Sequence, residues 1–67
     1  MTITVMSKGN EKYNVSMQIE KFSEAYQTSV YENIYGNWQR VAKSAYQTDR
    51  NKAEKAFTRY ARKYIEA

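Results

Sequence analysis

The sequence predicts an α+β fold: a small antiparallel β-meander of three to four strands packed on one C-terminal helix, in the order β-β-β-β-α. Three observations lead to this prediction. Apolar residues recur every three to four positions from Asp49 to Ile65, apolar and polar residues alternate from Tyr13 to Glu20, and Gly-Asn pairs at positions 9–10 and 36–37 mark turns. A chain of 67 residues has room for one domain, 1–67, with one modest core.

The first two strands are expected to form a hairpin over Lys8–Lys12. Residues 2–7 alternate, with Ile3 and Val5 against Thr2 and Thr4, and these residue types favour strands. The second strand has the clearest period of two in the chain, which places four apolar side chains on one face: Tyr13, Val15, Met17 and Ile19.

Residues 21–38 allow two interpretations. Five apolar residues step by four, as on a helix over 20–34: Phe22, Tyr26, Val30, Ile34 and Trp38. The segment is nevertheless rich in strand formers and in poor helix formers. We therefore favour a second hairpin, with strands at Tyr26–Ile34 and Trp38–Tyr46 joined at Tyr35-Gly36-Asn37. Regular alternation in the last strand would place Gln39, Val41, Lys43 and Ala45 on one face and Trp38, Arg40, Ala42, Ser44 and Tyr46 on the other.

The segment from Asp49 to Ile65 predicts an amphipathic helix that begins at an N-cap supplied by Thr48 or Asp49. Its apolar stripe consists of Ala53, Ala56, Phe57, Tyr60, Ala61, Tyr64 and Ile65. Phe57, Tyr60, Tyr64 and Ile65 of this stripe are expected to meet Val15, Met17 and Ile19 of the sheet. A helical wheel places five basic residues on the opposite side: Lys52, Lys55, Arg59, Arg62 and Lys63.

The composition argues against an enzyme. The chain has no cysteine and no histidine, which excludes disulfides and removes the commonest general base and metal ligand. Its seven carboxylates are scattered, and no phosphate-binding loop or metal-ligand spacing is present. We therefore expect no catalytic residues, no cofactor and no metal. No signal peptide or membrane-length apolar run is present, so a cytoplasmic protein without membrane contact is expected.

Aromatic and basic side chains remain as candidates for binding. Tyr13, Tyr60 and Tyr64 lie on apolar faces and are expected to pack in the core. The aromatics near the second turn are expected to form either a cross-strand cluster or an exposed contact patch. The candidate binding residues are the five basic helix residues together with Tyr31, Tyr35, Trp38, Arg40 and Lys43.

The net charge of +4 lies mostly on the helix, which suits an acidic partner surface or serves only for solubility. The first hypothesis is a non-enzymatic inhibitor that docks on a partner protein, acidic or nucleic-acid-binding, and blocks its functional surface. Phage accessory and anti-defence proteins, anti-CRISPR proteins among them, are of this kind. The alternative is a nucleic-acid-binding module that uses the basic helix face and Tyr/Trp stacking. A homodimer joined through an edge strand is a third possibility.

Overall fold

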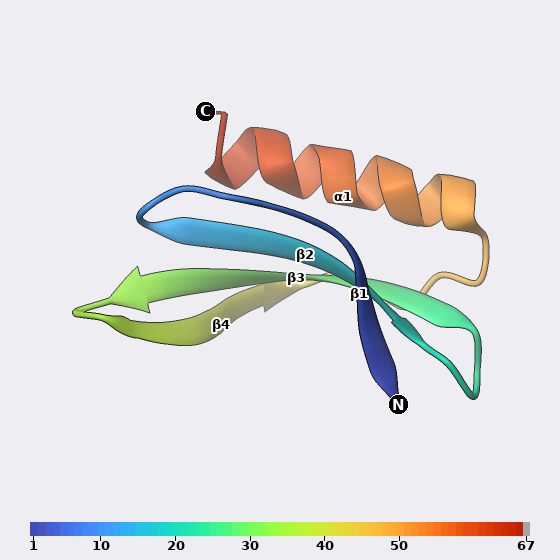
Figure 1. The fold of residues 1–67 in the computed structure, drawn as a ribbon. Helices are drawn as coiled ribbons and strands as arrows, with labels where there is room; N and C mark the ends of the chain where they lie inside the picture. Colours follow the sequence, from blue (N-terminus) through green and yellow to red (C-terminus); the bar gives the residue numbers. More distant parts are fainter. Residues whose placement is uncertain (67) are drawn as a thin grey trace.

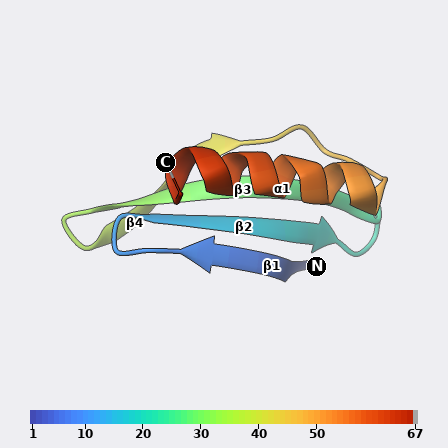
Figure 2. The same ribbon diagram turned by 90° about the horizontal axis from the view of Figure 1, so that it is seen from above.

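The computed structural model describes residues 1–66 as one antiparallel sheet followed by a helix (Figure 1). The elements are β1 (Thr2–Gly9), β2 (Tyr13–Glu20), β3 (Ala25–Ile34), β4 (Asn37–Lys43) and α1 (Arg50–Tyr64). The strands follow one another in the order β1-β2-β3-β4, and α1 crosses one face of the sheet (Figure 2). The predicted β-β-β-β-α fold is confirmed. None of the helices in the described residues is long and apolar enough to cross a membrane.

The first turn is held by the side chain of Asn10, whose Oδ1 accepts hydrogen bonds from the backbone N–H groups of Lys12 and Tyr13 at 2.9 and 2.8 Å. A Cβ atom at Gly9 would lie 2.9 Å from Nδ2 of Asn14 and 3.0 Å from the carbonyl oxygen of Tyr13. A larger residue at position 9 would therefore have to displace the Asn14 side chain and the Tyr13 carbonyl, so glycine suits this close approach of the two strands.

The second hairpin is also present, and the alternative of a helix at 20–34 is wrong. Its turn consists of Tyr35 and Gly36, both with positive φ, 52° and 87°. Two successive residues of this kind give the mirror-image turn whose twist matches that of paired strands. Asn33 Oδ1 accepts the N–H of Gly36 at 2.8 Å and fixes the geometry, while Asn37 belongs to β4.

The core lies between α1 and the two central strands. Val15, Met17 and Val30 are fully buried on the sheet, and Ala53, Phe57 and Ala61 are buried on the helix. The predicted packing of Tyr13, Tyr60 and Tyr64 against this core is confirmed, with ring centroids of Tyr13 and Tyr64 5.2 Å apart. Ile19 was expected to meet the helix stripe, but it is only half-buried and lies outside the core cluster, where it lines an open hollow with Tyr26 and Thr48.

Both edge strands carry a β-bulge. In β1 the register with β2 shifts around Val5, between Thr4 and Met6. In β4 it shifts between Arg40 and Ala42, which face Tyr31 and Val30 of β3. The ladder between the two central strands has no such shift. Bulges bend and twist an edge, which hinders the addition of a further strand.

The bulge in β4 corrects the predicted facing of this strand. Ala42 packs against the core, whereas Arg40 is paired with Tyr31 on the opposite face of the sheet. Regular alternation had placed the two on the same side. The extra residue, Val41, shifts the alternation by one position and leaves its own side chain 45% exposed.

The strand was also predicted to continue to Tyr46, but β4 ends at Lys43. Ser44 ends it, because its side-chain Oγ accepts the N–H of Thr28 at 3.0 Å in place of a backbone carbonyl. The chain rejoins the sheet at Gln47, which exchanges two backbone hydrogen bonds with Tyr26 at 2.7 and 2.8 Å.

Helix α1 begins at Asp49, whose carboxylate accepts the N–H of Asn51 at 2.8 Å, so Asp49 rather than Thr48 is the N-cap. Arg62 and Lys63 in the last turn suit the negative end of the helix dipole. Every buried residue of α1 lies on the predicted apolar stripe.

Candidate functional site

The face of the sheet that α1 does not cover, the open face, is one of two candidate binding surfaces (Figure 1). Its residues alternate along each strand with those of the core, and the register aligns them across the sheet. Most are polar and uncharged or aromatic: Thr2, Thr4, Ser7, Asn14, Ser16, Gln18, Gln27, Ser29, Tyr31, Asn33 and Trp38, with Glu20, Arg40 and Lys43 as charged members.

Two aromatic side chains lie together on this face. Tyr31 and Trp38, with Asn14, line an open hollow of about 320 Å³. Tyr31 is paired with Arg40, and Trp38 is two positions from Arg40 on the same side of β4. Trp38 is 49% exposed although its neighbours are aromatic and amide side chains, so part of a large apolar ring faces solvent. Such rings supply rigid contact area in protein interfaces.

A second hollow, of about 200 Å³, continues the open face towards the N-terminus. Here Tyr46, from the segment after β4, lies over the ends of the strands and is 65% exposed. The lining is polar around this ring and consists of Thr2, Gln18, Glu20, Ala25, Gln27, Arg40 and Tyr46.

Glu20 is the acidic residue of this hollow. The backbone N–H of Phe22 donates to its carboxylate, as do the N-terminal ammonium group and the hydroxyl of Thr2, at 3.0 to 3.1 Å. These groups lower the pKa of Glu20, with the Phe22 N–H the largest cause. The carboxylate is therefore already engaged, and Arg40 takes part in none of the ion pairs found within residues 1–66.

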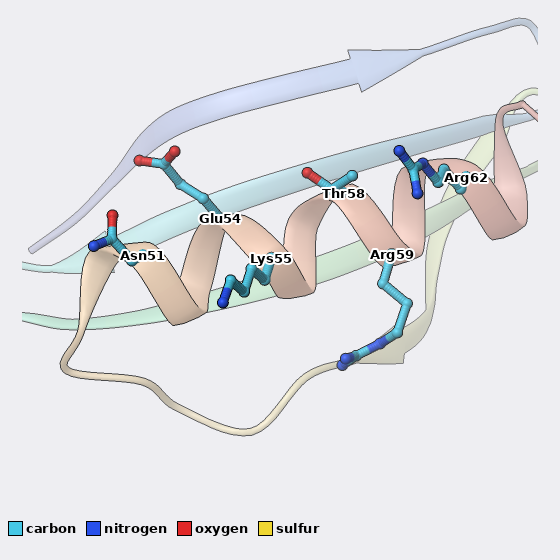
Figure 3. Close-up of a pocket in the computed structure, with 6 residues that line it drawn as sticks. All are labelled: Asn51, Glu54, Lys55, Thr58, Arg59 and Arg62. Atoms are coloured by element: carbon cyan, nitrogen blue, oxygen red, sulfur yellow. The ribbon is translucent and has the colours of Figure 1, made fainter.

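The second candidate surface is the outer face of α1. Lys55, Arg59 and Arg62 project from it together with Asn51, Glu54 and Thr58, around a shallow open hollow (Figure 3). Lys52 and Lys63 are exposed beside them. We call the five basic residues, Lys52, Lys55, Arg59, Arg62 and Lys63, the basic stripe.

The acidic residues near the basic stripe have other partners. Glu54 accepts from Nε of Arg50 at 2.8 Å, and Glu66 accepts from Nζ of Lys8 at 2.9 Å. Glu54 raises the pKa of Arg50, and Lys8, followed by the more distant charge of Arg62, lowers the pKa of Glu66. Among the residues that the structure describes, no salt bridge engages a member of the basic stripe.

The predicted binding residues therefore fall into separate groups. Tyr31, Trp38 and Arg40 lie together on the open face, and Lys43 follows at the end of β4, paired with Ser29. Tyr35 is fully exposed at the tip of the turn, apart from that cluster. The basic stripe lies on the opposite side of the molecule, because core contacts occupy the helix face that looks towards the sheet.

Sequence reasoning missed seven residues that line the two hollows of the open face: Thr2, Asn14, Gln18, Glu20, Ala25, Gln27 and Tyr46. The polar positions of the period-two pattern in β2 could have indicated Asn14, Gln18 and Glu20, because residues between core positions point away from the core. No local signal indicates Tyr46, whose position depends on where β4 ends.

No group of three or more carboxylate, histidine or cysteine side chains in residues 1–66 could hold a metal ion. The four hollows found are open to solvent. Comparison with protein-family models, curated proteins and solved structures gives no match. The arrangement of the two surfaces thus carries the functional interpretation.

Proposed function

We propose that this is a non-enzymatic binding protein that docks on a partner protein through its open face and blocks a functional surface of that partner. It would act as an inhibitor or regulator, of the kind that phages use against host defence. One observation carries the proposal: Tyr31 and Trp38 lie side by side around a hollow on the sheet face that α1 leaves uncovered.

The size of the open face suits a protein partner. The backbone spans 34 and 24 Å along its two longer axes, so the projected area of a face of this shape is at most about 800 Å². Each partner contributes about this much to an interface of standard size. The composition agrees, since Tyr, Trp, Ser, Asn and an unpaired Arg supply adaptable hydrogen bonds around rigid rings.

The open face is a better docking surface for a partner protein than either edge strand of the sheet. Both edge strands are bulged, around Val5 and Val41, so neither offers a long regular row of free backbone groups to a further strand. A homodimer joined edge to edge is therefore disfavoured.

A single nucleic-acid site that combines the basic stripe with Tyr/Trp stacking is also disfavoured. Tyr31 and Trp38 point away from α1, whereas Arg59 and Arg62 project from its outer side. One strand of nucleic acid would have to pass around the edge of the molecule to reach both.

The experiment begins with affinity capture from host extract by the wild type and by Trp38→Ala in parallel. A protein retained by the first and lost with the second is purified, and its Kd is measured by calorimetry. We expect Tyr31→Ala and Trp38→Ala each to weaken binding about 30-fold or more, because central interface aromatics contribute about 2 kcal/mol.

Phe22→Ala is the matched control, since Phe22 is an equally apolar ring, 92% exposed, in the turn between β2 and β3. It should change the Kd less than about twofold. If Tyr31→Ala and Trp38→Ala bind the purified partner as tightly as wild type, the open face is not the docking surface. If the bound partner keeps its full activity, the blocking role is wrong.

A further inference from the structure

We propose that the basic stripe of α1 is a separate binding site for the phosphate backbone of double-stranded nucleic acid. It acts independently of base sequence and on the side of the molecule opposite to the open face. The inference does not depend on the proposed docking of a protein, because it concerns other residues and another kind of contact.

The first argument is charge. The stripe consists of five exposed cations, and no salt bridge within residues 1–66 neutralises any of them. Glu54 of the same helix is held by Arg50, and Glu66, which follows the helix, is held by Lys8 with Arg62 nearby. Asp49 is used as the N-cap. The outer face thus presents positive charge that only an external anion can match.

The second argument is spacing. Successive members from Lys52 to Arg62 are three or four residues apart, which is about 4.5 to 6 Å along the helix axis. From Lys52 to Lys63 the stripe is about 16 Å long. A duplex carries one phosphate charge about every 1.7 Å of its axis when both strands are counted, so this length carries about nine phosphates for the five cations.

The third argument distinguishes paired from unpaired strands. Proteins that hold single strands stack the bases on aromatic side chains. Tyr60 and Tyr64 belong to the packed side of α1, where Tyr60 donates to the carbonyl of Lys43 and Tyr64 lies against Tyr13. Arg59 and Lys63 of the stripe lie over the Tyr60 and Tyr64 rings, 5.7 and 5.5 Å from the ring centroids. Within residues 1–66 these rings are thus engaged on both sides, so the outer face offers unpaired bases no open stacking platform and is suited to a duplex, whose bases are already stacked.

The side chains that line the hollow on the outer face of α1 also suit a phosphate backbone. Asn51 and Thr58 add uncharged donors between the cations, and the hollow is shallow and open along the helix (Figure 3). An extended backbone can lie along such a surface, whereas a small molecule would stay largely in solvent.

The test is fluorescence anisotropy with a labelled duplex of about 20 base pairs and with a single strand of the same length. We expect the full-length protein to bind the duplex with a Kd below about 100 µM in about 50 mM salt. The slope of log K against log salt should be about −4 to −5, as for five phosphate contacts. Unrelated duplex sequences should bind alike.

Arg59→Gln/Arg62→Gln should weaken duplex binding at least about tenfold and make the slope shallower by about 2, since two phosphate contacts are lost. Gln is a good helix former, so the helix should persist. Lys21→Glu, in the turn between β2 and β3, is the matched control because it removes the same two units of net charge. It should change the affinity less than about threefold.

Lys52→Gln/Lys55→Gln should reproduce the effect on the other half of the stripe, and circular dichroism verifies the fold of each variant. Three results would overturn the proposal. One is absence of duplex binding in low salt, and another is equal affinity of Arg59→Gln/Arg62→Gln and Lys21→Glu. The third is preferential binding of the single strand that Trp38→Ala abolishes, which would place nucleic acid on the open face.

Discussion

The two surfaces of this small protein differ in almost every property that governs recognition. The open face is broad, mostly uncharged and carries three aromatic rings, of Tyr31, Trp38 and Tyr46. The basic stripe follows a 15-residue helix about 22 Å long and has charge without aromatic rings. The difference teaches that one thin sheet-and-helix sandwich presents a mostly uncharged, aromatic surface on one side and a charged surface on the other. Binding to the open face should therefore depend little on salt, and binding to the stripe strongly.

The largest expected effect comes from breaking the core that both surfaces share. Phe57 is 7% exposed and packs against the cluster of Val15, Met17 and Val30. Phe57→Ala should cost about 3 to 5 kcal/mol, which is comparable with the whole stability of a domain of this size. Urea denaturation should show a largely unfolded chain, and both binding activities should be lost together. Retention of either activity would mean that one surface folds without the shared core.

The second largest loss of stability is expected from a change at the N-cap of α1. Asp49→Ala removes the acceptor of the Asn51 N–H at the start of α1 and should cost about 1 kcal/mol. For a domain of this size this corresponds to a fall in Tm of roughly 4 to 8 °C. Hydrogen exchange should increase at the first turn of α1 and remain unchanged in β2 and β3. Thr48→Ala is the control, and an equal loss of stability there would show that Asp49 is not the decisive cap.

A change in stability of similar size and opposite sign is expected for Thr28, which is buried between the sheet and α1. Thr28 is 1% exposed beside Met17, and its hydroxyl has no hydrogen-bond partner within residues 1–66. Thr28→Val keeps the shape and removes the buried hydroxyl, so it should stabilise the protein by about 1 kcal/mol. Thermal unfolding measures the gain. A loss of more than about 1 kcal/mol would mean that the Thr28 hydroxyl makes a contact that stabilises the fold.

The smallest expected effect is a pH dependence of stability that comes from Glu20, at the end of β2 on the open face. Because the pKa of Glu20 is lower in the folded chain, its contacts stabilise the protein above the ordinary glutamate pKa of about 4.3. This contribution is lost as the pH falls below that value and through the lower pKa of the folded state. Glu20→Gln should lower Tm slightly at neutral pH and reduce its decline in acid. Parallel acid profiles of wild type and variant would contradict this assignment.

The sequence was sufficient for the order of elements because the two signals that specify it are local. The period of two from Tyr13 to Ile19 predicted β2, and the stripe around Phe57 predicted α1; both were confirmed. The choice of strands over a helix for the region around Val30 depended on residue preference, and the Tyr35-Gly36 turn supports it.

The predictions that were wrong concern features of β4 that depend on contacts between strands. The bulge at Val41 is an irregularity of register with β3, and nothing in the residues of β4 alone indicates it. Likewise Ser44 ends β4 because it meets the N–H of Thr28 from a neighbouring strand. These two features decide where Trp38, Arg40 and Tyr46 lie, so the composition of the open face could be predicted only in part. The separation of the basic stripe from Tyr31 required the sheet to be assembled.

The alternation of core and open-face residues along the same strands has a consequence for evolution. On β3, Tyr31 follows the fully buried Val30, and on β2, Asn14 and Gln18 lie to either side of the buried Val15 and Met17. Under the proposed docking, a mutation at an outward position would change what the protein recognises and leave the packed side chains untouched. A protein that docks through this face could therefore adapt to changes in its partner's surface while it keeps its own fold.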